Sequence, residues 1–141
     1  MSTYAPQIAA AFRPQPPALS RISLRRVLVV EDQRRMREQL VQDVEAFGCT
    51  AFSAAGSHDA IRIAALERPD VILIDGLLPQ MHGFELARFL RALDSNYRPR
   101  ICIVTSVYKH VRYQNEARLK YGVDHYLIKP VGYDALLEVL S

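Results

Sequence analysis

The sequence is short of cysteine. Its 141 residues include only Cys49 and Cys102, which stand too far apart for a paired-ligand spacing such as C-x-x-C. Cys102 lies inside the apolar run of residues 101–104, so we interpret it as a buried thiol. This cysteine usage indicates neither a cysteine-based metal site nor an oxidising compartment.

Long apolar segments and nucleotide-binding loops are missing as well. No apolar run approaches the ~18 residues of a membrane-spanning helix, and the start lacks the charged-then-apolar order of a signal peptide. No G-x-G-x-x-G or G-K-[ST] motif follows an apolar run, which argues against a nucleotide-binding domain. We therefore expect a cytoplasmic protein without membrane insertion.

Acidic residues are absent from the first 26 residues, which hold four arginines. The net charge of +3 arises there, because the remaining 14 Lys and Arg residues are matched by 15 Asp and Glu residues. Residues 1–24 also contain four prolines and no sustained apolar period, so we expect a flexible N-terminal arm, followed by one domain over residues 25–141. Arginines in such an arm are weak evidence for nucleic-acid binding, and we expect none from the domain.

Short apolar runs dominate the rest of the chain. The strongest, rich in β-branched residues, are 27–30, 71–74 and 101–104. Unbroken runs of this kind are typical of parallel strands that are covered on both faces. Residues 50–54 and 125–128 are weaker strand candidates.

Helical patterns separate these strands. They cover residues 33–47, a segment from Ser57 to Pro69, and residues 84–93, 111–121 and 133–140. We expect Ser57 to cap the second helix, with Ile61, Ala64 and Ala65 facing inward. Right-handed crossovers then predict a doubly wound α/β domain with five parallel strands and five helices on both faces of the sheet.

Polar residues stand directly after four of the predicted strands. They are Glu31 and Asp32, Asp75, Thr105 and Lys129. The carboxyl ends of parallel strands meet at one edge, where doubly wound domains place their sites. Clustered carboxylates raise one another's pKa unless a cation neutralises them, and Mg²⁺ prefers such ligands. A lysine ammonium suits a phosphoryl oxygen.

Four blocks of the sequence, residues 27–32, 75–83, 104–106 and 124–130, resemble the signature blocks of response-regulator receiver domains, and the similarity covers residues 25–141. The resemblance implies a flavodoxin-like sheet of strand order 2-1-3-4-5. It also implies a two-component signalling switch, not an enzyme with a separate substrate. Such a switch takes its phosphoryl group from a sensor histidine kinase or a phosphotransfer protein and acts on a downstream protein target.

The resemblance further implies a phosphorylation and metal site. Asp75 matches the phosphoacceptor. Glu31 and Asp32 match the acidic pair that holds Mg²⁺ together with Asp75, and Leu77 matches the residue whose backbone carbonyl completes the metal site.

A second set of residues matches the groups that sense the phosphate. Thr105 and Lys129 would contact the phosphoryl oxygens, and Tyr126 would act as the aromatic switch that follows Thr105. The Lys129–Pro130 peptide bond would be cis.

The sequence also departs from the family pattern. The segment from Thr105 to Lys129 is about two residues longer, in an aromatic stretch at 107–113, and Ser106 replaces a smaller residue. Leu77 and Val107 are apolar where many faster receivers carry polar groups, which predicts slow self-dephosphorylation.

Two alternatives stay open: a pseudo-receiver acting as a phosphorylation-independent interaction module, and a metal-dependent phosphohydrolase. The phosphohydrolase would require a second aspartate two residues after Asp75, and Leu77 occupies that position.

Overall fold

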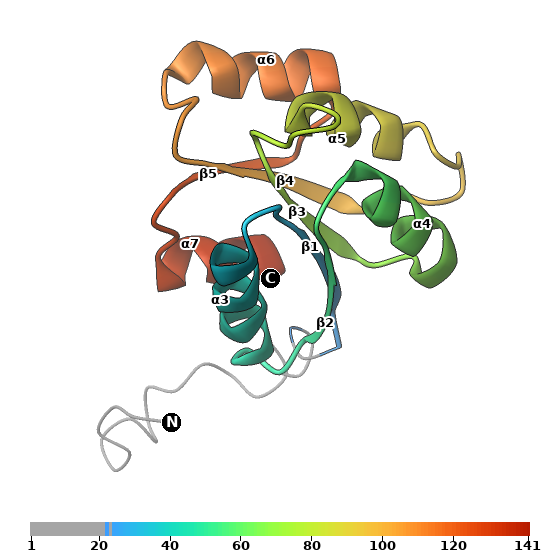
Figure 1. The fold of residues 1–141 in the computed structure, drawn as a ribbon, viewed down its shortest axis with the longest axis vertical. Coiled ribbons are helices and arrows are strands. Elements are labelled where there is room, and N and C mark those ends of the chain that lie inside the picture. Colours follow the sequence, from blue (N-terminus) through green and yellow to red (C-terminus); the bar gives the residue numbers. More distant parts are fainter. Residues whose placement is uncertain (1–21, 23) are drawn as a thin grey trace.

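A five-stranded parallel sheet forms the centre of the fold (Figure 1), as the computed structural model shows for residues 22 and 24–141. The strands are β1 (Arg26–Val30), β2 (Thr50–Ala54), β3 (Val71–Asp75), β4 (Arg100–Thr105) and β5 (His125–Ile128). Their order is β2-β1-β3-β4-β5, and every neighbouring pair is parallel. The predicted fold class and strand order are confirmed.

Helices cover both faces of the sheet. They are α3 (Arg34–Glu45), α4 (Ser57–Glu67), α5 (Gly83–Arg91), α6 (Val111–Tyr121) and α7 (Tyr133–Leu140). Helices α3 and α7 lie on one face, and α4, α5 and α6 lie on the other (Figure 1). Over residues 22 and 24–141, no helix combines the length and the apolar character needed to cross a bilayer.

Alternate residues of each central strand supply two separate cores. On β3, Ile72 and Ile74 pack beneath α4, α5 and α6, whereas Val71 and Leu73 pack beneath α3 and α7. All four side chains are at most 1% exposed. Because successive side chains of a strand point to opposite faces, a strand covered on both sides needs an unbroken apolar run.

Two details of α4 differ from the sequence prediction. Gly56, in extended backbone conformation, is the N-cap residue, and Ser57 is the first helical residue instead. The buried Ser57 hydroxyl faces the side-chain oxygen of Gln80 at 3.5 Å. Ala65 is exposed, and Ala60 takes the inward position because it lies one turn before the buried Ala64.

The predicted N-terminal arm, residues 1–24, lies outside the described residues except for Ile22 and Leu24. Ile22 is buried at 4% exposure and belongs to the core beneath α3 and α7. Its carbonyl accepts a hydrogen bond from the Cys49 thiol at 3.2 Å. The packed core therefore includes Ile22, which precedes the first residue of β1 by four positions.

Candidate functional site

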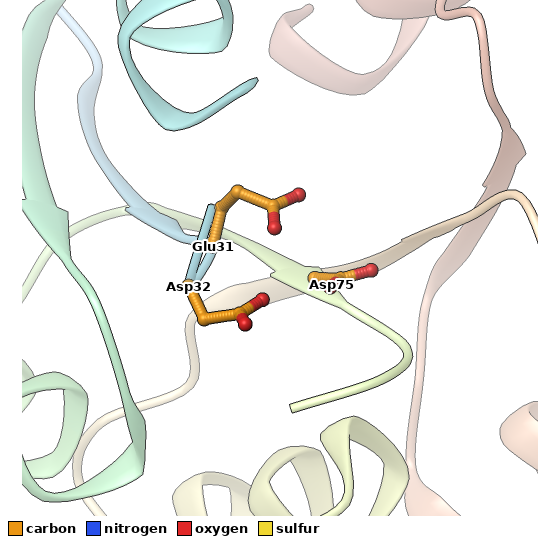
Figure 2. Close-up of side chains that lie close together, drawn as sticks. All are labelled: Glu31, Asp32 and Asp75. Atoms are coloured by element: carbon orange, nitrogen blue, oxygen red, sulfur yellow. The ribbon is translucent and has the colours of Figure 1, made fainter. Parts of the chain in front are cut away.

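The three acidic residues meet at the carboxyl edge of the sheet. Glu31 and Asp32 follow β1, and Asp75 is the last residue of β3; the two strands are neighbours, with Val30 paired to Ile74. One oxygen from each carboxylate lies within 4.8 Å of the other two. Figure 2 shows Glu31 and Asp32 directing their carboxylates to the side on which Asp75 lies.

The loop after β3 folds back tightly to shape this edge. A Cβ atom on Gly83 would lie only 2.2 Å from the Asp75 carbonyl oxygen, so a residue with a side chain would force the loop away. The Gly83 N–H also donates to the Gly76 carbonyl at 3.3 Å. The start of α5 is thereby fixed against the end of β3, next to Asp75.

Burial and charge perturb Asp75. The pKa of Asp75 is raised to about 6. Burial is the largest cause, and the nearby Glu31 carboxylate is the second. Lys129 and the Leu77 backbone N–H act in the opposite direction without cancelling these effects. The surroundings of Asp75 therefore disfavour its charged form, through burial first and through the Glu31 charge second.

Lys129 reaches this cluster from the end of β5. Its Nζ lies 2.7 Å from Glu31 Oε1 and 3.5 Å from Asp75 Oδ1. The second Glu31 oxygen accepts the Gln33 N–H at 3.2 Å, so the buried Glu31 carboxylate is bound at both oxygens. The Lys129–Pro130 peptide bond is cis, as the resemblance implies. The ion pair with Glu31 is a contact that the sequence did not indicate.

A cavity of about 320 Å³ opens above Asp75. Its lining includes the three carboxylates, Lys129 and Ser106, and at its mouth Leu77 and Val107. Leu77 is 50% exposed and Val107 is 57% exposed, so both apolar side chains flank the approach from solvent.

Thr105 and Tyr126 do not line this cavity. Thr105 is fully buried, and its hydroxyl accepts the N–H groups of Val107 at 3.1 Å and Tyr108 at 3.2 Å. The Tyr126 hydroxyl donates to the Tyr108 carbonyl at 2.6 Å. Both expected switch residues thus meet at Tyr108, a residue of the aromatic stretch 107–113 that was not expected in the site.

The donor set fits a hard divalent cation. Three carboxylates lie beside only one lysine, and the negative charge of Glu31 adds to burial in raising the pKa of Asp75. Mg²⁺ uses one or two carboxylates, carbonyl oxygens, waters and phosphate oxygens. Glu31, Asp32 and Asp75 are the residues that could hold such an ion.

Comparison with known proteins agrees with this geometry. The response regulator receiver domain family matches residues 27–141. The chain is 36% identical over 118 residues to transcriptional regulatory protein CitB of Klebsiella pneumoniae. The aligned region covers 81% of this chain and 48% of that protein. The chain is 31% identical over 112 residues to response regulator MprA of Mycolicibacterium vanbaalenii, covering 79% and 47%. The chain thus spans about half the length of the curated relatives it matches.

Solved structures show the same likeness. A CheY-like receiver domain from Methanospirillum hungatei is 29% identical with a TM-score of 0.71, covering 82% of this chain and 89% of that one. A second, from Methylobacillus flagellatus, is 25% identical with a TM-score of 0.73, covering 84% and 99%. The chain therefore belongs to the response-regulator receiver-domain family of two-component systems.

Proposed function

We propose that the domain is a phosphorylation switch that accepts a phosphoryl group on Asp75 and uses Mg²⁺. One observation carries the proposal: three carboxylates and Lys129 surround a single cavity at the carboxyl edge of the sheet. The pKa of about 6 still leaves Asp75 mostly ionised at pH 7, as a nucleophile must be.

The transfer step follows from these residues. An Asp75 oxygen attacks the phosphorus of a phosphohistidine donor, so that a P–O bond forms while the P–N bond breaks and the donor imidazole leaves. Lys129 supplies positive charge near Asp75, where the phosphoryl oxygens would come to lie. When bound, Mg²⁺ would neutralise charge on the carboxylates and the phosphoryl oxygens. Glu31, Asp32, Asp75 and the Leu77 backbone carbonyl would hold it.

The signal leaves the site through Thr105 and Tyr126. A phosphoryl group on Asp75 would draw the Thr105 hydroxyl away from its two backbone donors. Tyr108 is one of those donors, and its carbonyl accepts a hydrogen bond from the Tyr126 hydroxyl. Tyr126 would therefore respond to the same shift. The altered surface would comprise α6, β5 and α7.

We propose a cytoplasmic setting for this switch. The donor would be a sensor histidine kinase or a phosphotransfer protein, and the receiver of the signal a downstream protein target. The domain would catalyse only its own phosphoryl transfer and a slow self-dephosphorylation. Residues 1–24 would form an N-terminal arm that Ile22 fastens to the domain.

Mg²⁺ titration, followed by amide NMR with and without beryllofluoride, tests the proposal. We expect weak Mg²⁺ binding with shifts at the cavity residues, and further shifts across α6, β5 and α7 when beryllofluoride is added. Asp32→Ala should remove most of the Mg²⁺ affinity, because it deletes one of three ligands. Mg²⁺ binding without any beryllofluoride response would favour the pseudo-receiver alternative.

A further inference from the structure

Tyr108 joins both switch residues to the loop that follows Asp75. Its backbone N–H donates to Thr105 Oγ1 and its carbonyl accepts from Tyr126, while its hydroxyl lies 3.0 Å from His82 Nε2. Tyr108 belongs to the loop between β4 and α6, and His82 precedes α5. The hydroxyl–imidazole pair therefore connects two loops 26 residues apart in the chain.

The position of His82 defines the direction of this hydrogen bond. Its Nδ1 accepts the Phe84 N–H at 3.3 Å and so caps the N-terminus of α5. Burial lowers the pKa of His82, which favours the neutral ring that such a cap requires. A neutral ring with an accepting Nδ1 carries its proton on Nε2, so His82 donates to the Tyr108 hydroxyl.

The Tyr108 ring also closes over the residue next to the phosphoacceptor. A Cβ atom on Gly76 would lie 3.5 Å from Tyr108 Cδ2 and 3.1 Å from Thr105 Cβ. The ring centroids of His82 and Phe84 lie 5.1 and 5.7 Å from that of Tyr108. Thr105 and Tyr108 are thus packed side by side against Gly76.

We propose that Tyr108 and His82 form a latch that holds Thr105 in its resting position. The two residues are positioning residues that act through Thr105, and the proposal rests on the phosphorylation switch proposed above. Thr105 can turn toward a phosphoryl group on Asp75 only if it releases Val107 and Tyr108 or carries their loop with it. The bond from Tyr108 to His82 ties that loop to the start of α5 and opposes the movement.

The latch predicts that its removal strengthens binding of beryllofluoride in the presence of Mg²⁺. Tyr108→Phe keeps the ring and deletes the hydroxyl. His82→Asn keeps an acceptor for the helix cap but is too short to preserve the bond. Each variant should bind beryllofluoride about fivefold more tightly, which corresponds to about 1 kcal/mol and to one hydrogen bond. The double variant should gain no more than either single one, because both remove the same interaction.

Tyr113→Phe is the matched control. It makes the same chemical change in a ring 5.1 Å from Tyr108, but its hydroxyl contacts the exposed Arg112 and not His82. Its beryllofluoride affinity should equal that of the wild type. As a second readout, Tyr108→Phe should lower the free energy of unfolding of the unliganded protein and leave that of the beryllofluoride complex unchanged.

The outcomes separate the latch from the function beneath it. Failure of the wild type to bind beryllofluoride would overturn the proposed function, and the latch with it. Intact wild-type binding with equal or weaker binding by the two single variants would overturn the latch alone. Additive gains in the double variant would do the same, because they would show that Tyr108 and His82 act separately.

Discussion

The two sides of Asp75 differ in kind. Toward β1 and β5 the neighbours are charged, with Glu31, Asp32 and Lys129 around an open cavity. Toward the β4–α6 loop they are neutral and closely packed, with Thr105 and Tyr108 held by hydrogen bonds of 3.0 to 3.2 Å. The charged side is suited to chemistry, and the neutral side is suited to sensing whether that chemistry has occurred.

This difference predicts effects of different size. On the charged side, Asp75 would carry the reacting atom under the proposed function, so its loss should remove the reaction. On the neutral side each contact is a single hydrogen bond, worth ~1 kcal/mol, or ~1.5–3 kcal/mol where the partner is charged. Substitutions on the two sides therefore should not resemble each other.

The largest effect is expected for Asp75→Asn. An amide cannot act as the nucleophile, so phosphorylation by a small acyl-phosphate donor with Mg²⁺ should be abolished. The measurement is incorporation of phosphate, followed by intact-protein mass. Glu67→Gln, an acidic residue whose side chain pairs with Arg26 away from the cavity, serves as control and should be phosphorylated like the wild type. A phosphoryl adduct that survives in Asp75→Asn would show that another residue is the acceptor.

The sequence could predict the charged side because backbone pairing alone assembles it. Once β1 and β3 are parallel neighbours, the residues at their carboxyl ends meet, whatever rotamers they adopt. The choice of Lys129 between Glu31 and Asp75 could not be predicted in this way. It depends on how deeply each carboxylate is buried, and Glu31 is only 2% exposed.

The contacts on the neutral side were harder to predict from the sequence. Thr105 and Tyr126 could be matched by resemblance, but the place of Tyr108 depends on packing against Gly76 and on the His82 ring. No periodicity signals such a contact between two loops. An aromatic residue three positions after Thr105, in a lengthened loop, was the one available indication.

The second prediction tests the neutral side. Thr105→Ala should leave Asp75 open to phosphorylation but weaken the response of α6, β5 and α7. The lost hydrogen bond to a charged phosphoryl group is worth ~2 kcal/mol. Amide NMR shifts of the beryllofluoride complex measure the response across residues 107–121 and 126–140. Thr50→Ala, at an exposed strand end, is the control. Wild-type shifts in Thr105→Ala would remove Thr105 from the switch.

The third prediction uses the perturbed pKa of Asp75. Its folded-state pKa of about 6 exceeds the ordinary 3.8, so the ionised group destabilises the fold above pH 6, and this cost disappears as pH falls toward 4. Asp75→Asn should therefore raise the free energy of unfolding at pH 7 by about 1.5 kcal/mol, roughly half of what the full shift implies because solvent in the open cavity screens the group.

Unfolding by urea at pH 7 and at pH 4 measures this effect. The gain in Asp75→Asn should shrink at pH 4, and Mg²⁺ at pH 7 should stabilise the wild type more than the variant. A variant less stable than the wild type at pH 7 would show that burial and the nearby Glu31 charge do not destabilise ionised Asp75.

The smallest effect is expected at the mouth of the cavity, where the charged side meets solvent. Water must reach the phosphorus of phospho-Asp75 in line with the bond to Asp75, and the flanking Leu77 and Val107 can only screen it. Leu77→Asn with Val107→Glu supplies groups that can orient an attacking water. Phosphate release should become several-fold faster, on the order of 1 kcal/mol in the barrier. Val111→Glu adds the same charge at a 59% exposed position outside the cavity lining and should leave the rate unchanged. Equal rates in the double variant and the wild type would show that these side chains do not control the access of water.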